Sequence, residues 1–491
     1  MKSRYIHYQV VIIALLSIFS VSIYLITSQL VYRIGFPLDD ACIHQTYARN
    51  MIYRGEWSFI PGIISAGSTA PLWSILISIG YLLNMGPFLW TFTLGWILLL
   101  TVALLGRKVV LSYNPNKANW SLAIAIGLIF EWHLVWSAVS GMETLLLAVM
   151  VMVVMLLIVT RSNKWTLMGA LIGISVWVRP DGITLIIPAF IAIVLSDGPK
   201  SEKLLAFVKL NISFGLILVL YLFFNNTIGG EWLPNTFFAK QAEYAVEKNA
   251  PVLTRLLEQA SVPVIGVGIC LLPGFLIFSW NAIKTKAWIN LVPVMWTIGL
   301  LSLYALRLPV TYQHGRYVIP MMPVFFLLGW LGLLQWISLS SPIFWRRVVS
   351  RTWVITTWGV LLVFYLLGAR AYGTDVAIIE SEMVDNARWI AEFTDEDSLI
   401  AAHDIGAIGF FSGRRIVDLA GLVSPDVIPI IRDEPQLAAY LNSQEVDYLV
   451  TFPGWYPVLT ENLNPAYTSN AKFSPSQGGE NMTIYFWNSL P

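Results

Sequence analysis

Long apolar runs, separated by short polar segments, make up most of the first 370 residues. A run of roughly 20 apolar residues is long enough to cross a bilayer as an α-helix, and this length predicts about eleven spans. The predicted spans are residues 9–30, 88–106, 120–138, 142–160, 165–178, 182–196, 204–224, 261–280, 288–306, 318–338 and 353–369. We therefore expect a mainly α-helical, polytopic membrane bundle.

The pattern changes near residue 371, after which charges occur throughout and short β-like runs alternate with helical stretches. The β-like runs are Leu399–Ala402, Arg415–Leu419, Asp447–Phe452 and Met482–Trp487. This alternation is typical of a small α/β fold. We predict a transmembrane module over residues 1–370, with an outer loop at 31–87, and a second domain over residues 371–491.

Basic residues between the spans predict the orientation of the chain. With the N-terminus inside, every inner segment carries Lys or Arg, as the positive-inside rule requires. This holds only if the short apolar run Pro71–Leu83 is not a full span, so we place it at the outer surface or as a re-entrant helix. The result is a multi-pass plasma-membrane protein with a cytoplasmic N-terminus and an extracytoplasmic domain at 371–491.

Composition narrows the class of partner. The chain is 57% hydrophobic and 12% charged, and its net charge of +1 gives no indication of nucleic-acid binding. Two cysteines form no disulfide framework and no metal cluster, so we expect no cofactor and leave a need for divalent metal open. No Gly-rich phosphate loop or dinucleotide motif is present, which disfavours a nucleotide donor. The partners that remain as candidates are membrane lipid and lipid-linked substrates.

The most polar part of the first hundred residues is the stretch from Phe36 to Trp73, which opens with Asp39 and Asp40. A helix is predicted over Ala41–Arg54, because Gly55 and several later Pro and Gly residues interrupt the chain. Two adjacent carboxylates raise each other's pKa, which favours proton acceptance near neutral pH. The simpler alternative is that one of them only caps the helix.

Other ionisable residues fall near the same predicted outer face. They are His44, Glu131, His133, Glu143, Arg179, Asp181, Glu231, Lys240, Arg307, His314 and Arg316. Charges at membrane depth are costly and usually mark function. Carboxylates suit a base, and arginines suit a phosphate leaving group, so the combination predicts a lipid-phosphate substrate.

Each of these residues also has a structural alternative. Arg179 and Asp181 form a local pair in a turn, Glu143 lies at a helix N-terminus, and Arg316 is positioned to anchor the chain at the interface. Trp57 and Trp73 are candidates to stack on a sugar, although interface anchoring is the commoner role of Trp in membrane proteins. These alternatives stay open at this point.

Several motifs together resemble a known superfamily. The stretch FPLDDACIHQTYARNMIYRGEWSFIPG…AGSTAPLW looks like the first outer loop of the GT-C membrane glycosyltransferases. Further pieces match in order: AVSGMETLLL (138–147), VRPDG (178–182), LPNTFFAK (233–240), HGRYVIPMMP (314–323) and AAHDIGAIGFFSGRRIVDLAGLV (401–423). The chain is similar to mycobacterial arabinofuranosyltransferases and, more distantly, to protein mannosyltransferases, many of which carry Asp-Glu in place of Asp-Asp.

The resemblance implies a polyprenyl-phosphate-sugar donor, an extracytoplasmic active site and an Asp on the first loop as general base. We therefore expect Asp39 and Asp40 to be catalytic. The expected contacts to donor phosphate are Arg316, Arg179, Lys240 and His314, and those to acceptor or sugar are His44, Glu143, Asp181, Trp57 and Trp73. The acceptor is a glycan, a lipid or a protein, and its identity stays open.

Two other functions compete with glycosyl transfer. A transporter or flippase for lipid-linked glycans would need polar groups near the midplane, where the sequence places none. A non-catalytic scaffold of the cell envelope would have no use for the Asp pair. The predicted C-terminal domain has its own polar cluster, which binds glycan or forms a salt-bridged turn: His403, Asp404, Arg414, Arg415 and Asp418.

The predicted topology is testable by cysteine labelling. A cysteine introduced at Ser443, in the predicted extracytoplasmic domain, should react with a membrane-impermeant maleimide in intact cells. A cysteine at Lys284, in a predicted inner segment, should react only after permeabilisation. Protection of position 443 in intact cells would overturn the orientation.

Overall fold

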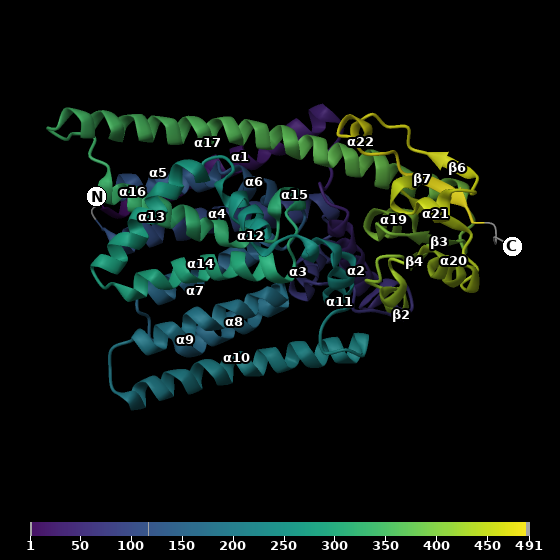
Figure 1. The fold of residues 1–491 in the computed structure, drawn as a ribbon, viewed down its shortest axis with the longest axis horizontal. Coiled ribbons are helices and arrows are strands. Elements are labelled where there is room, and N and C mark those ends of the chain that lie inside the picture. The colour runs from purple at the N-terminus through teal and green to yellow at the C-terminus, as the bar shows by residue number, and fades with distance from the viewer. Residues whose placement is uncertain (1, 116, 488–491) are drawn as a thin grey trace.

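A bundle of helices carries a smaller α/β unit at one end (Figure 1). The computed structural model describes residues 2–115 and 117–487. The bundle helices are α1 (Lys2–Val31), α4 (Pro87–Tyr113), α5 (Ala118–Ile129), α6 (Trp132–Ala138), α7 (Thr144–Val159), α8 (Trp165–Val178), α9 (Ile186–Leu195), α10 (Lys200–Gly229), α13 (Gly268–Lys284), α14 (Trp288–Arg307), α16 (Met322–Trp336) and α17 (Phe344–Ile378).

Each predicted span corresponds to a helix or a helix pair, but the count of eleven is not confirmed. Six helices in the described part of the chain are long and apolar enough to cross a membrane, and two bent pairs raise the number to eight. The pair α5–α6 bends by 59°, and α12 (Val252–Ser261) bends against α13 by 105°. Helices α7, α8 and α9 are apolar but shorter than a full span. The chain is an integral membrane protein.

The first outer loop folds close to its prediction. Helix α2 (Asp40–Arg54) ends where Gly55 adopts a left-handed conformation (φ 70°) and donates its N–H to the carbonyl of Asn50. A short hairpin, β1 (Ser58–Ile60) with β2 (Ile63–Ile64), follows. Helix α3 (Pro71–Leu82) has 12 residues, too few to span a membrane, as expected for the run Pro71–Leu83.

Short helices connect several longer helices of the bundle, and one of them, α11, lies beside the C-terminal unit (Figure 1). They are α11 (Asn235–Glu243), α12 and α15 (Tyr312–Gly315). Short 3₁₀ segments lie at η1 (Pro180–Leu185), η2 (Val246–Asn249), η3 (Val262–Val264) and η4 (Ile319–Met321). Helix α12 exposes apolar side chains and buries Arg255 and Gln259, a pattern that suits a helix lying at a membrane interface.

The C-terminal unit contains a five-stranded sheet in the order β4-β3-β5-β7-β6. Its strands are β3 (Leu399–Ala402), β4 (Arg415–Asp418), β5 (Tyr448–Thr451), β6 (Pro465–Thr468) and β7 (Thr483–Phe486). β3 is parallel to β4 and β5, whereas β7 is antiparallel to β5 and β6. Four strands match the predicted β-like runs, and β6 has no predicted counterpart.

Helices connect and flank these strands. They are α18 (Asp385–Phe393), α19 (Ile405–Ser412), η6 (Pro425–Ile430), α20 (Glu434–Ser443), η7 (Pro453–Trp455), α21 (Pro457–Thr460) and α22 (Phe473–Ser476). α19 directly follows β3, so its N-terminus lies at the carboxyl end of a parallel strand. This is the edge at which open α/β sheets usually bind ligands.

No linker separates the two parts of the chain. The predicted boundary at residue 371 falls inside α17, which continues through the π-helical turn η5 (Ile379–Val384) into α18. Within η5, the buried carboxylate of Glu382 accepts hydrogen bonds from Ser469, from Asn481 (2.9 Å) and from the backbone N–H of Met482 (2.8 Å). The last long helix of the bundle is therefore bonded into the C-terminal unit.

Candidate functional site

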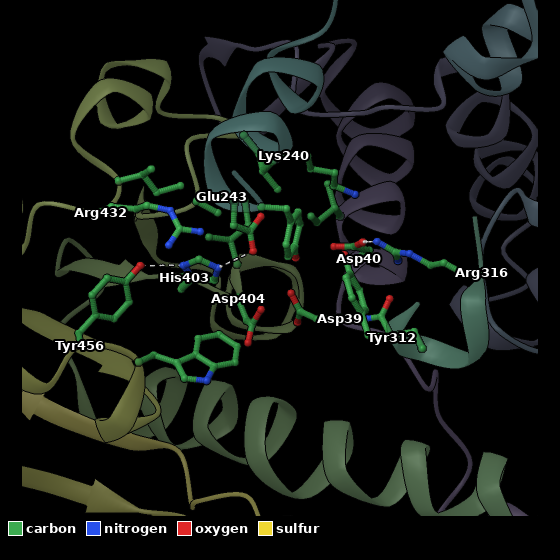
Figure 2. A pocket seen from close by; sticks show the side chains of 18 of the residues that line it. Asp39, Asp40, Lys240, Glu243, Tyr312, Arg316, His403, Asp404, Arg432 and Tyr456 are labelled. Atoms are coloured by element: carbon green, nitrogen blue, oxygen red, sulfur yellow. Dashed lines mark hydrogen bonds and ion pairs between the residues drawn. The ribbon is translucent and has the colours of Figure 1, made fainter. Parts of the chain in front are cut away.

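A cavity of about 650 Å³ lies where the first loop, the short helices and the C-terminal unit meet (Figure 2). Its polar lining residues are Asp39, Asp40, Lys240, Glu243, Tyr244, Tyr312, Gln313, Arg316, His403, Asp404, Arg432, Glu434 and Tyr456. They come from in and around α2, α11 and α15 and from the segments that follow β3, η6 and η7. A volume of this size is in the usual range for a small-molecule site.

Asp39 joins the first loop to the C-terminal unit. Its side chain does not cap α2, the helix that it precedes. Instead, its two carboxylate oxygens accept the backbone N–H groups of Gly406 (2.6 Å) and Ala407 (2.7 Å), in the first turn of α19. Asp39 therefore caps the N-terminus of α19 and not that of α2, for which the cap was predicted. A Cβ on Gly406 would lie 2.6 Å from Asp39 Oδ2, so the approach requires glycine.

A second carboxylate, Asp404, lies beside Asp39 (Figure 2). Asp404 precedes α19 at the N-cap position, yet its side chain makes no cap hydrogen bond. Its Oδ2 is buried and has no hydrogen-bond partner among the described residues. Asp39 thus occupies the first turn that Asp404 would otherwise cap, and the carboxylate of Asp404 faces the cavity.

The electrostatic environments of these carboxylates differ. Burial and the negative charge of Asp404 raise the pKa of Asp39, against the two backbone hydrogen bonds that lower it. Burial also raises the pKa of Asp404, to about 6, although nearby His403 opposes the shift. Burial alone would raise the pKa of Asp40 as well, but Arg316 and Lys240 outweigh it and hold that pKa well below its usual range.

Three cations converge on the ring of Tyr317. The Tyr317 hydroxyl accepts hydrogen bonds from Lys240 (2.8 Å) and Arg316 (3.1 Å). The guanidinium carbons of Arg179 and Arg316 lie 5.1 and 5.0 Å from the ring centroid. Arg316 also pairs with Asp40 at 2.6 Å, while its other terminal nitrogen, Nη1, is buried without a partner. That nitrogen carries N–H groups that can donate charge-assisted hydrogen bonds to an anionic ligand.

A smaller cavity of about 40 Å³ extends from Asp40 and the cations into the bundle. Here Arg179 pairs with Asp181 (3.2 Å) and lies 3.7 Å from Glu143, which is also 3.7 Å from His44. The structure thus brings together the predicted residues Asp40, His44, Glu143, Arg179, Asp181, Lys240 and Arg316. The local Arg179–Asp181 pair exists, and it is part of this larger network.

Three other predicted site residues lie elsewhere. His314 bonds to Asp375 (2.8 Å) and lines a different cavity, so the structure does not bring it together with the other predicted phosphate contacts. Trp73 is 1% exposed and donates its indole N–H to Gly141, which gives it a structural role in place of a sugar contact. Trp57 packs between Tyr47 and Phe224 and does not line the cavity.

The C-terminal cluster predicted at His403, Asp404, Arg414, Arg415 and Asp418 divides in the structure. His403 and Asp404 line the cavity, where His403 bonds to the Tyr456 hydroxyl (2.7 Å) and lies 3.7 Å from Glu243. Asp418 is buried and accepts the backbone N–H groups of Ala420 and Val423, both at 2.8 Å. It therefore stabilises a turn, which is the structural alternative for this cluster.

Sequence reasoning missed Tyr317, Glu243 and Tyr456, and it gave no role at the first-loop site to His403 and Asp404. Their position in the sequence could have indicated a role for His403 and Asp404, because both directly follow the predicted strand Leu399–Ala402 and ligands usually bind at the carboxyl ends of such strands. Within residues 2–115 and 117–487, no group of three or more His, Cys, Asp or Glu side chains is arranged to hold a metal ion.

Comparisons with known proteins identify the fold. The oligosaccharyltransferase of Archaeoglobus fulgidus aligns with a TM-score of 0.64 at 12% identity, over 91% of this chain and 69% of that chain. ArnT from Cupriavidus metallidurans aligns with a TM-score of 0.56 at 14% identity, over 97% of each chain. A further structure of that ArnT, bound to undecaprenyl phosphate, aligns with a TM-score of 0.55 at 14% identity, over 96% of this chain and 97% of that one.

These similarities confirm the GT-C fold that the sequence motifs predicted. A mycobacterial arabinofuranosyltransferase, AftD, aligns with a TM-score of 0.47 at 13% identity, over 96% of this chain and 40% of that chain, which is too distant to carry an argument. A family model described as a domain of unknown function (DUF8728) matches residues 374–485. No curated protein matches the sequence.

Hydrogen exchange can test the contact between Asp39 and α19. Asp39→Ala removes the acceptor of the Gly406 and Ala407 amides, and hydrogen bonds to charged groups contribute about 1.5–3 kcal/mol. We expect exchange in a peptide covering residues 403–410 to accelerate about tenfold or more in mass spectrometry. Asp40→Asn is the matched control and should leave this peptide unchanged. Equal exchange in both variants would show that Asp39 does not hold α19.

Proposed function

We propose that this chain is a membrane glycosyltransferase that moves a sugar from a polyprenyl-phosphate donor to a hydroxyl acceptor at the extracytoplasmic face, with inversion at the anomeric carbon. The observation that carries the proposal is the juxtaposition in one cavity of paired carboxylates with Arg316, whose Nη1 is buried and unpartnered. Carboxylates supply a base, and the cations stabilise a phosphate leaving group. The GT-C fold makes this pairing expected.

The donor phosphate is assigned to the cations around Tyr317. Arg316 and Lys240 line both the main cavity and its inner extension, so a phosphate there contacts both. Arg179 contributes its charge from the far side of the Tyr317 ring. These cations are already held by Asp40, Tyr317 and Asp181, which reduces the reorganisation needed on binding. The solved ArnT complex with undecaprenyl phosphate supports a ligand of this class.

The base is assigned to Asp39, as the resemblance implies. The acceptor oxygen forms a bond to the anomeric carbon and loses its proton to Asp39, while the bond from that carbon to the phosphate oxygen breaks. The bonding electrons leave with polyprenyl phosphate, whose negative charge Arg316 and Lys240 stabilise. Burial and Asp404 raise the pKa of Asp39, which favours proton transfer near neutral pH. Asp40 positions Arg316.

The competing functions fit the geometry less well. A transporter needs a substrate site near the midplane that is reached from both faces. The charged groups here line a cavity beside the C-terminal unit, and that unit lies at one end of the bundle (Figure 1). A scaffold has no need of a cavity in which carboxylates and cations meet, because buried charges cost stability.

Donor binding tests the phosphate assignment. Arg316→Ala should weaken the binding of undecaprenyl phosphate to the purified full chain by roughly 10- to 150-fold, because a charge-assisted contact is worth about 1.5–3 kcal/mol. Arg255→Ala is the matched control, since Arg255 is also buried but bonds to the carbonyl of Ala305 outside the cavity. Unchanged affinity in Arg316→Ala, or equal losses in both variants, would move the phosphate site elsewhere.

Sugar transfer tests the base. Asp39→Asn should reduce transfer from a labelled polyprenyl-phosphate sugar by at least about a hundredfold, because an amide does not accept the proton. Binding of undecaprenyl phosphate should be retained, since Asp39 does not contact the cations. Asp40→Asn should impair transfer less.

Because Asp39 also docks α19, the exchange rate of residues 403–410 must be measured in the same Asn variant. If Asp39→Asn loses transfer while residues 403–410 exchange as slowly as in the wild type, the loss supports Asp39 as the base. Near-normal transfer in Asp39→Asn, with an inactive Asp40→Asn, would assign the base to Asp40.

A further inference from the structure

A second cavity of about 530 Å³ lies on the other side of the segment that contains α15. Tyr312 and Gln313 line both this cavity and the main one, so only this segment separates them. The second cavity contains His314, Asp375 and Trp136, none of which has a role in the transfer step described above. Its volume suits a small-molecule ligand.

The dividing segment has an unusual backbone. Gln313 (φ 53°, ψ 47°) and His314 (φ 57°, ψ 26°) are both left-handed, and Gly315 follows with a φ of 68°. Two consecutive non-glycine residues rarely adopt this conformation, and strained backbone of this kind clusters at functional sites. Here the left-handed turn directs His314 into the second cavity while Arg316, two residues later, lies on the first.

Two histidines in the second cavity are each held by a carboxylate. His314 Nε2 bonds to Asp375 (2.8 Å), which also accepts the Trp136 indole N–H (2.9 Å). His133 Nδ1 bonds to Glu131 (2.9 Å). An ionised carboxylate only accepts, so the ring nitrogens that bond to Asp375 and Glu131 carry protons. His133 is fully buried in the wall of the cavity, and its Nε2 has no hydrogen-bond partner among the described residues.

The second cavity differs from the first in its cations, because Lys240, Arg316 and Arg432 line the first. No Lys or Arg of the described residues lines it, whereas Glu258 and Asp375 do. A phosphate would meet carboxylates without a compensating cation. Hydroxyl groups, which both donate and accept hydrogen bonds, would instead meet His314 and Glu258, beside the indoles of Trp132 and Trp136. This set of groups suits an uncharged, hydroxyl-rich ligand.

We infer that the second cavity is a binding site for an uncharged sugar unit of the acceptor, and this inference rests on the proposed glycosyl transfer. An acceptor held there extends past Tyr312 and Gln313 into the main cavity, where its reacting hydroxyl meets Asp39. Phosphate and acceptor sugar are thus separated by the presence of cations on one side of the strained segment and their absence from the lining of the other. The acceptor class is therefore a glycan, either free or as the head group of a glycolipid.

Binding to the full chain in nanodiscs tests this site without requiring turnover. The probes are neutral trisaccharides (maltotriose, mannotriose and arabinotriose), glucosyl-diacylglycerol in the disc, and undecaprenyl phosphate. Saturation-transfer NMR should detect at least one trisaccharide for a free glycan acceptor, or only the glucosyl head group for a glycolipid acceptor. His314→Asn, which tolerates the left-handed backbone, should weaken that binding tenfold or more and leave undecaprenyl phosphate unaffected.

Arg316→Ala is the reciprocal control. It should weaken the binding of undecaprenyl phosphate and leave the binding of the sugar probe unchanged. If His314→Asn does not fold, His314→Gly, which also tolerates the left-handed backbone, replaces it. The inference is overturned if no neutral sugar binds, if binding survives in the histidine variant, or if that variant loses undecaprenyl phosphate instead. Failure of the proposed function is distinguishable, because sugar binding that depends on His314 would then persist in a protein without transfer.

Discussion

The contact between the Asp39 carboxylate and the first turn of α19 is the constraint on which the site depends. It connects the first loop of the bundle to the carboxyl end of strand β3, through two backbone N–H groups that have no partner inside their own helix. The cavity lies between these two parts, and each contributes one wall. The same contact places His403 and Asp404, which directly precede α19, beside the Asp pair.

Charge within the site is organised around this contact. Buried charges are tolerated when they are paired, and Asp40 with Arg316, and Arg179 with Asp181, satisfy that condition. Glu143 Oε2, at the inner cavity, is buried without a hydrogen-bond partner, and so are two atoms of main-cavity residues, Arg316 Nη1 and Asp404 Oδ2. One is a cationic donor and the other a carboxylate acceptor, and both belong to groups at the cavity. A substrate with a phosphate and a hydroxyl would satisfy both.

Local signals in the sequence predicted local structure well. Gly55 ended α2 as expected, and four strand-like runs became strands, because turn residues and alternating patterns act over a few positions. The number of spans was not predictable in this way, since α7, α8 and α9 are apolar yet short. Nor was the boundary near residue 371, where a single helix crosses without any change in backbone.

The site was only partly predictable, because its contacts join distant segments. The clustering of Asp40, Arg179, Lys240 and Arg316 followed from charges placed on one predicted side of the bundle. The partner of Asp39 lies more than 360 positions away, and no local pattern reveals such a contact. Tyr317 was missed because a tyrosine beside an apolar run gives no signal of the three cations around it. His314 lies apart from the other predicted phosphate contacts because the left-handed backbone turns it away from Arg316.

The central claim is that the cations around Tyr317 hold the phosphate of a lipid-linked donor beside the Asp pair. A structure of the full chain in nanodiscs with undecaprenyl phosphate tests it most directly. The account predicts phosphate density within hydrogen-bond distance of Arg316 and Lys240, with the lipid chain leaving toward the bilayer. Phosphate density in the cavity that contains His314, or away from both cavities, would contradict it.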